Sequence, residues 1–357
     1  PQVAHGRVFA LQQFSRTLYA YDAYTGRSLW KQRGEGKEAG FITRFVSRPE
    51  GVYAAGRGVC AVYDPATGRE LRRMTFSEAM PADSKARAAG VVVTDTSVLI
   101  AGANVATGAI EQGLWDAEVL VCLDRKSGKI RWKRAAGERF NIKALAAHDG
   151  RVFCTDSMSP LASEYWKRRG AGVTECSSTV MALNEMTGDV LWQHQFTSPY
   201  RQHGASGWLS VRTRDDWLVC VTATNRVIAG RERHAVLLAA DNGTVVWEKD
   251  VGLAQPLIIM GKHLLDQAGR RVDIETAEVL KGGLFARGGC NYAVANQHLA
   301  ILRDQTVCYV DIDSGERHRL RNMRSGCSNS TIPAAGLLNI PNFAVGCVCN
   351  YPIQTSS

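Results

Sequence analysis

The sequence predicts an all-β protein in which one short-strand unit recurs along the chain. Three segments share an apolar run, an Asp or Asn, a Gly four residues later and a Trp four residues after that Gly. These segments, LYAYDAYTGRSLW, LVCLDRKSGKIRW and VMALNEMTGDVLW, end at Trp30, Trp132 and Trp192. The sequence shows no amphipathic helix of any length, so the repeat itself predicts the architecture.

Each copy has the pattern of a β-hairpin. The alternating residues before the Asp are typical of a strand, and the Gly can take the positive φ that a tight turn requires. The Asp side chains are expected to bond their own turns rather than to do chemistry; they are Asp22, Asp64, Asp124, Asp273 and Asp311. Four weaker copies bring the total to seven and lie around Gly68, Trp247, Ala277 and Gly315. The recurrent Trp30, Trp132, Trp192 and Trp247 are expected to pack on the neighbouring unit.

A further pair of short strands precedes most copies, which makes units of about four strands. Such units repeated around an axis form a β-propeller. We predict one domain, a single β-propeller of four-stranded blades, with eight blades favoured and seven as the alternative. Strands from both termini would close the ring and remove its open edge. The approximate blades are 1–40, 41–85, 86–138, 139–199, 200–253, 254–285, 286–323 and 324–357.

The composition is that of an ordinary globular protein. Of the 357 residues, 45% are hydrophobic and 22% are charged, which excludes a disordered or fibrous chain. No apolar run approaches the roughly 18 residues of a membrane-spanning helix. The net charge of +9 favours an anionic partner, but the basic residues are scattered and lack interleaved aromatics. We therefore expect no nucleic-acid partner, and we expect a monomer.

The ten cysteines exceed what a cytosolic protein of this length usually carries, which indicates an oxidising compartment. Five lie in apolar strand-like runs, where a free thiol behaves as a small buried side chain; they are Cys60, Cys122, Cys154, Cys220 and Cys308. Four lie in glycine-containing segments near the end of the chain: Cys290, Cys327, Cys347 and Cys349. Two disulfides among these four would fasten the last blades, with a four-thiolate metal site or free thiols as alternatives. We predict no metal site.

Polar residues near the starts of the blades are the candidate ligand contacts, because the innermost strand of each blade lines the central channel of a propeller. An Arg together with a His can bind a carboxylate or sulfate, and a His can act as a general base. The alternative is that these side chains satisfy strand-end backbone atoms and ordered water. The candidates are Arg44, Asn141, His203, Trp208, Asn291 and Asn329.

The Ala-x-Asp-x-x-Thr-Gly-x-x-x-Trp pattern resembles the tryptophan-docking repeat of pyrroloquinoline-quinone (PQQ) alcohol dehydrogenase-like propellers, over nearly the whole chain. The tail GCSNSTIPAAGLLNIPNFAVGCVCNYPIQTS resembles the C-terminal signature of a bacterial, exported subgroup of these propellers. The resemblance implies a PQQ-like β-propeller and a periplasmic or extracellular location. Because the chain begins at Pro1 without a charged n-region or an apolar h-region, we expect a mature or partial chain without its signal peptide.

The dehydrogenases of this family hold the quinone against a disulfide between adjacent cysteines, next to a calcium ion bound by carboxylate and amide side chains. This sequence has no adjacent cysteine pair, and the nearest pair is Cys347 with Cys349. It also lacks a Cys-x-x-Cys-His haem-attachment motif. We therefore predict no cofactor, and the residues do not support PQQ with calcium.

Two functional hypotheses remain. The first is an exported, non-catalytic β-propeller that binds or scaffolds a protein or an anionic polysaccharide. The second is an enzyme with a site in the channel, either a PQQ-dependent oxidoreductase of alcohols or sugars or a lyase or hydrolase of anionic glycans. The sequence favours the first because it contains no nucleophile, zinc or phosphate-binding motif. Whether the chain is catalytic stays open, and its catalytic residues are unknown.

Overall fold

The computed structural model describes most of the chain. The described residues are 2–12, 15–33, 42–81, 86–104, 116–157, 168, 170, 178–196, 218–222, 224–230, 234–251, 254, 257–286, 291–321, 323, 331–334 and 336–340. Two compact units are present. The first comprises 1–221, 225–231 and 238–245, and the second comprises 222–224, 232–237 and 246–357.

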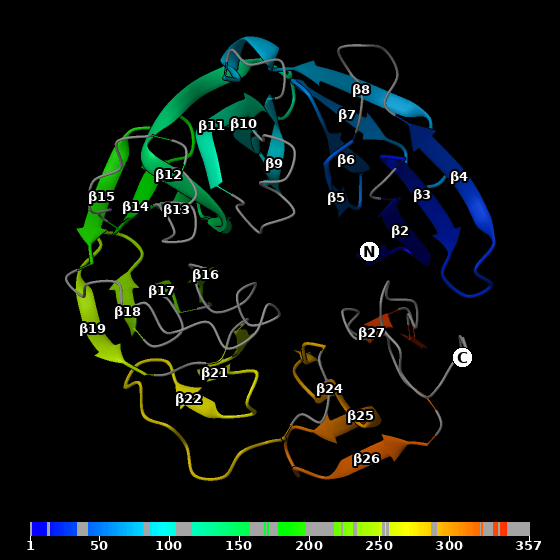
Figure 1. Cartoon of the computed structure of the whole chain (residues 1–357), viewed down its shortest axis with the longest axis vertical. Helices are drawn as coiled ribbons and strands as arrows, with labels where there is room; N and C mark the ends of the chain where they lie inside the picture. Colours follow the sequence, from blue (N-terminus) through cyan, green and yellow to red (C-terminus); the bar gives the residue numbers. More distant parts are fainter. Residues whose placement is uncertain are drawn as a thin grey trace. The chain divides into compact units, whose positions relative to one another are not determined.

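The first two sheets of the first unit each contain four strands in sequence order (Figure 1). One sheet consists of β1 (Gln2–Ala4), β2 (Arg7–Gln12), β3 (Thr17–Asp22) and β4 (Ser28–Arg33). The other consists of β5 (Arg44–Arg48), β6 (Gly51–Ala55), β7 (Val59–Tyr63) and β8 (Glu70–Thr75). Neighbouring strands of both sheets pair antiparallel, as the predicted hairpins require.

A seven-stranded sheet follows in the first unit. It consists of β9 (Ala86–Val93), β10 (Ser97–Asn104), β11 (Asp116–Asp124), β12 (Ile130–His148), β13 (Arg151–Ser157), β14 (Ser178–Asn184) and β15 (Val190–Gln195). Residues 138 and 139, between which the sequence predicts a blade boundary, lie within one continuous strand. β12 pairs with β11 through its first part and with β13 through its last part, because its 19 residues are long enough for both.

The remaining strands form four smaller sheets. They are β16 (Leu218–Val221), β17 (Arg226–Gly230), β18 (His234–Ala239) and β19 (Val245–Asp250); β20 (Ile258–Met260), β21 (His263–Leu265) and β22 (Arg271–Asp273); β23 (Val294–Ala295), β24 (Leu299–Asp304), β25 (Thr306–Asp311) and β26 (Arg317–Leu320); and β27 (Ile332–Ala334) with β28 (Leu337–Asn339). The described part contains one short helix, the 3-10 turn η1 (Ser77–Ala79). Within the described residues, no helix is long and apolar enough to cross a membrane.

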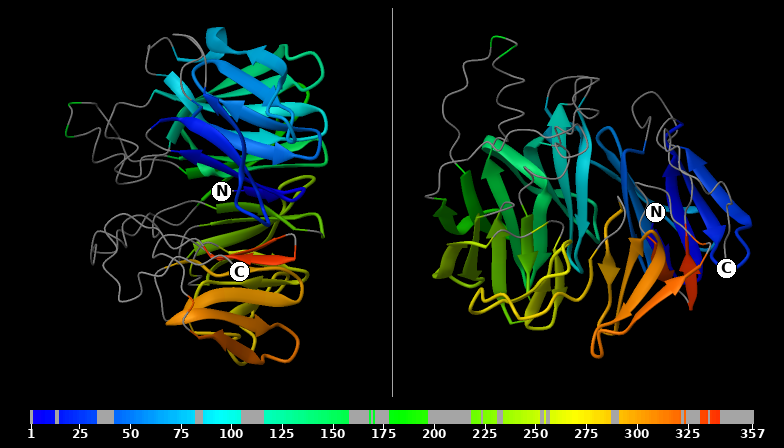
Figure 2. Two further views of the ribbon diagram at one scale, coloured as in Figure 1. Left: turned by 90° about the vertical axis from the view of Figure 1, so that its right-hand side faces the viewer. Right: turned by 60° about the horizontal axis from the view of Figure 1, so that its bottom comes forward.

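The core of the first unit lies between successive sheets, which stand side by side in Figures 1 and 2. Phe9 and Leu18 of β2 and β3 are fully buried in one cluster with Val52 of β6. Met74 of β8 is buried in a second cluster with Ile100 of β10. Apolar side chains from neighbouring sheets therefore exclude water between them, which is the main stabilising contribution in such a repeat.

The predicted turns are confirmed. Asp22 Oδ1 accepts hydrogen bonds from the backbone N–H groups of Tyr24 and Thr25 at 3.0 and 2.8 Å, and the other turns repeat this pattern. These bonds favour the ionised carboxylate and lower the pKa of Asp22. The turn glycines all have positive φ, and Ala277 adopts the same conformation with a φ of 61°.

Candidate functional site

Four Trp residues make one recurring contact between successive repeats. The indole Nε1 of each donates a hydrogen bond to a backbone carbonyl in the next repeat turn along the chain. The four pairs are Trp30 with Pro65 (3.0 Å), Trp132 with Glu185 (2.9 Å), Trp192 with Ala240 (2.9 Å) and Trp247 with Ile274 (2.8 Å). The contact gives the buried indole donor an acceptor and ties each turn to the strand that carries the Trp.

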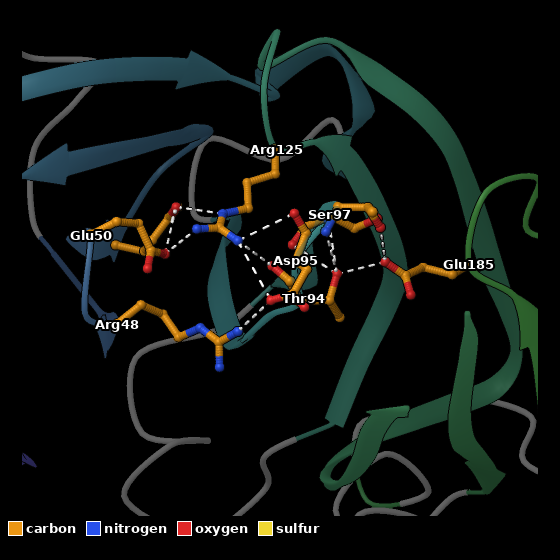
Figure 3. A network of polar contacts seen from close by, with 9 residues as sticks. Arg48, Glu50, Thr94, Asp95, Ser97, Arg125 and Glu185 are labelled. Atoms are coloured by element: carbon orange, nitrogen blue, oxygen red, sulfur yellow. Dashed lines mark hydrogen bonds and ion pairs between the residues drawn. The ribbon is translucent and has the colours of Figure 1, made fainter. Parts of the chain in front are cut away.

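A polar network joins turns of two sheets of the first unit (Figure 3). Arg125, in the turn between β11 and β12, forms an ion pair with Glu50 in the turn between β5 and β6. Its NH1 group also donates to the backbone carbonyls of Thr94 and Asp95, at 3.0 and 3.2 Å. Arg48, at the end of β5, pairs with Asp95 at 3.1 Å. One guanidinium therefore holds three turns in fixed relative positions.

Glu185 forms the other end of the network and is only 4% exposed. Its Oε1 atom accepts hydrogen bonds from the hydroxyls of Thr94 and Thr96, both at 2.6 Å. Burial alone would raise the pKa of Glu185, but the bonds from Thr94, Thr96 and Ser97 and the charge of Arg131 outweigh it and lower the pKa. The carboxylate is therefore held ionised as a structural link between β9–β10 and β14–β15.

The solvent side of this network combines charged and apolar side chains. Asp95 is almost fully exposed, while Arg125 is mostly covered. Met186, directly after Glu185, is 51% exposed. We call Arg48, Glu50, Asp95, Arg125 and Met186 the turn surface.

Arg44 is the candidate channel residue that the structure describes most fully. It opens β5, and its Nε donates to the carbonyl of Ala89 in β9 at 2.6 Å. Its NH1 group donates to the carbonyl of Thr43 at 2.7 Å. Burial, and secondly the positive charge of Arg16, lower the pKa of Arg44 to about 10. Part of its role is therefore to satisfy strand-end carbonyls.

The other candidate channel residues are only partly described. Asn141 is buried in β12 of the first unit, and Asn291 is buried in the second unit, just before β23. His203, Trp208 and Asn329 lie outside the described residues. The convergence of the six candidates on one site therefore stays a prediction.

The cysteines divide as the sequence predicts, as far as they are described. Cys60, Cys122, Cys154 and Cys308 are free and buried, which confirms them as core side chains. Burial raises the pKa of the Cys60 thiol to about 12, so this thiol is unreactive in the folded protein. Cys220 lies in β16, but its side chain is not described. The four cysteines of the predicted disulfides, Cys290, Cys327, Cys347 and Cys349, lie outside the described residues.

The family model described as outer membrane protein assembly factor BamB matches residues 1–118 and 56–342 of the sequence. These two matches cover most of the chain. The chain belongs to this family of PQQ-like β-propeller repeats. No curated protein matches the sequence.

Solved structures extend the comparison. The chain is similar to the Dos1 propeller, with 11% identity, a TM-score of 0.54, and coverage of 81% of this chain and 70% of that one. It also matches BamB from Moraxella catarrhalis, with 13% identity, a TM-score of 0.48, and 83% and 77% coverage. A third match is quinohemoprotein alcohol dehydrogenase from Comamonas testosteroni, with 13% identity, a TM-score of 0.47, and 85% and 51% coverage. The chain thus spans about half the length of that dehydrogenase. The first likeness shows the β-propeller fold.

The residues of this family member do not fit the calcium and quinone site of the family's dehydrogenases. The sequence contains no adjacent cysteines to stack on a quinone. Within the described residues, no group of three or more His, Cys, Asp or Glu side chains could hold a metal ion. Asp22, Asp64 and Asp124 instead bond their own turns. We derive no chemical step through PQQ.

Sequence reasoning missed the network residues Arg125, Glu185 and Thr94. The sequence did contain one signal. Arg125 and Glu185 each stand directly after the turn Asp or Asn, and the residue at this position supplies the backbone carbonyl that the repeat Trp binds. Their side-chain partners lie in turns that are distant in the sequence, so only the folded sheets bring them together.

Proposed function

We propose that this chain is an exported, non-catalytic β-propeller that binds a partner protein through the turn surface. The observation that carries the proposal is the exposed Met186, which directly follows the network residue Glu185, together with charged side chains that are already held in place. Met and Arg are enriched at protein interfaces relative to the rest of the surface, and rotamers fixed before binding reduce the entropy cost of association. The family description as an outer membrane protein assembly factor supports both the scaffold role and export.

The ion pairs of the turn surface also suit recognition. Asp95 lies between Arg48 at 3.1 Å and Arg125 at 3.9 Å, so its charge is held at a defined position on the surface. A fixed pattern of charges selects partners with the complementary pattern and rejects others. Anionic polysaccharide is the second class of partner in this proposal, supported by the net charge of +9.

Site-specific photocrosslinking in living cells tests the proposal. A photoreactive benzoylphenylalanine replaces Met186, and a matched variant carries it at Lys133, which is exposed near the start of β12. We expect one discrete protein adduct from position 186 and none from position 133. Adding Arg48→Glu to the position-186 variant is expected to weaken the adduct.

Two results would overturn the proposal. One is an adduct pattern that is the same at both positions. The other is turnover of an alcohol or sugar by the purified chain with added PQQ and calcium, which would favour the oxidoreductase alternative instead.

A further inference from the structure

Four arginines lie at the end of the first unit that is opposite the turn surface. Arg16 lies in the turn between β2 and β3, and Arg57 lies in the turn between β6 and β7. Arg44 and Arg87 lie at the starts of β5 and β9. In an antiparallel meander, the start of the first strand and the turn between the second and third strands lie at the same end. We call these four residues the arginine cluster.

Hydrogen bonds to backbone carbonyls hold three of the cluster's segments together. Thr43 Oγ1 donates to the carbonyl of Ala88 at 2.6 Å, next to the bond from Arg44 to Ala89. The amide of Ala88 in turn donates to the carbonyl of Gly56 at 3.1 Å. The start of β5, the turn that carries Arg57 and the start of β9 therefore form one fixed frame.

The positive charges of the cluster act on one another. Burial, and secondly the charge of Arg16, lower the pKa of Arg44. Burial, and then the charges of Arg57 and Arg16, lower the pKa of Arg87. The charge of Arg16 thus acts on both Arg44 and Arg87, whose segments are held side by side by the bonds described above. A group of positively charged side chains in one frame raises the local concentration of anions.

We propose that Arg16, Arg44, Arg57 and Arg87 form a binding site for an oxyanion ligand that carries at least two carboxylate, sulfate or phosphate groups. The planar guanidinium fork pairs with two oxygens of such a group, which makes Arg the preferred residue for this recognition. Guanidinium groups contributed by three neighbouring sheets match a ligand with several charges better than one with a single charge. The inference rests on the proposal that the chain is a binding protein, but it concerns the opposite end of the unit.

The same chemistry can come from a free small anion or from the acidic sugars of a polysaccharide. Citrate represents the first source and trigalacturonate represents the second, because both carry several carboxylates. Calorimetric titration of the full chain with citrate and with trigalacturonate at low salt distinguishes the two sources. Tighter binding of citrate would assign a small anion, and tighter binding of trigalacturonate would assign an acidic glycan.

The variants distinguish the effect of the arginine cluster on binding from the effect of the protein's net charge. Arg87→Gln and Arg16→Gln remove cluster charges, whereas Arg44 also holds the carbonyl of Ala89 and is left intact. Arg69→Gln is the matched control, because Arg69 is exposed at the opposite end of the β5–β8 sheet. We expect the double variant to lose about tenfold or more in affinity, and the control to change by less than about twofold.

A second readout does not depend on the ligand. Without an anion, Arg87→Gln is expected to melt at a higher temperature than the wild type, because one repulsive charge is gone. Citrate or trigalacturonate should then raise the melting temperature of the wild type more than that of the variant. The proposal is overturned if neither anion binds, or if Arg69→Gln weakens binding as much as Arg87→Gln. Neither result affects the crosslinking expected at Met186. The proposed oxyanion site can therefore be wrong while the proposed partner surface is right, and the reverse.

Discussion

Arg72 donates a hydrogen bond from its NH1 group to the backbone carbonyl of Arg125. Arg72 stands four residues after the turn glycine Gly68, where the other close repeats have Trp. The carbonyl of Arg125 corresponds to that of Glu185, which accepts the indole bond of Trp132. A guanidinium thus replaces an indole as the donor between successive repeats, with the difference that Arg72 is exposed and Trp132 is buried.

This difference predicts unequal costs for removing the two donors. Trp132→Phe keeps a buried ring but removes the donor to Glu185, so we expect a loss of about 1–2 kcal/mol in the free energy of unfolding. Arg72→Ala removes an exposed donor, and the carbonyl of Arg125 can then accept a hydrogen bond from water. We expect a loss below about 1 kcal/mol in the free energy of unfolding. Urea denaturation of both variants checks the order, and a larger loss for Arg72→Ala would contradict it.

The turn glycines are expected to differ in their tolerance of alanine. Gly26 and Gly188 both have positive φ, so a Cβ atom costs about 1–2 kcal/mol at either position. At Gly188 that atom would also lie 2.7 Å from Cδ2 of Trp132, whereas at Gly26 nothing lies within 4 Å. We expect Gly188→Ala to cost about 1–3 kcal/mol more than Gly26→Ala. Equal urea midpoints would show that Trp132 does not pack tightly on this turn.

Glu185 predicts a pH-dependent contribution to stability. Its pKa in the folded protein is lowered from 4.5, so the ionised group stabilises the fold above the unfolded pKa. This contribution is lost as the pH falls through the folded pKa. We expect Glu185→Gln to lower the free energy of unfolding by about 2 kcal/mol at pH 7, and by much less at pH 3.

Urea denaturation at pH 7, 5, 4 and 3 measures this difference. Glu78→Gln, which removes an exposed carboxylate, is the control and should differ little from the wild type at any of these values. A stability difference for Glu185→Gln that does not change with pH would show that the carboxylate charge is not what Thr94 and Thr96 stabilise.

His234 predicts the opposite dependence in the second unit. Its ring nitrogens lie 2.8 Å from Glu248 and 2.9 Å from Asp250. Burial alone would lower the pKa of His234, but the bonds and charges of these two carboxylates raise it. The imidazolium therefore stabilises the fold fully below the unfolded pKa of about 6.5, and the contribution disappears as the pH rises through the folded pKa.

Thermal denaturation of the wild type and of His234→Asn checks this prediction. The two melting temperatures should differ most at pH 5.5 and converge at pH 8.5. His298→Asn, which changes an exposed histidine, provides the comparison. A difference that grows with pH would mean that His234 stabilises the fold in its neutral form.

Much of the local structure was predictable from the sequence. The Asp-x-x-Thr-Gly segments form the expected turns because their bonds join residues two or three positions apart. Even Ala277, which lacks the glycine, keeps the turn, since Asp273 makes the same bonds there. The buried Cys60 and Cys154 follow from the apolar strands that contain them.

The candidate binding residues were less predictable. Arg44 was chosen as a channel contact, and the structure adds its bonds to Ala89 and Thr43. The link between Glu185 and Thr94 joins residues 91 positions apart, and no local pattern encodes such a distance. The long strand β12 was likewise unexpected, because its two halves pair with different neighbours.

The sequence by itself determined the all-β repeat, the turn chemistry and the family, because each depends on residues within one short unit. Only the tertiary structure decided which turns meet, and so placed Arg125 beside Glu50 and Thr94 beside Glu185. Repeats that are alike in sequence do not specify which of their variable side chains will face one another. That choice is made when successive sheets pack and bury their apolar faces.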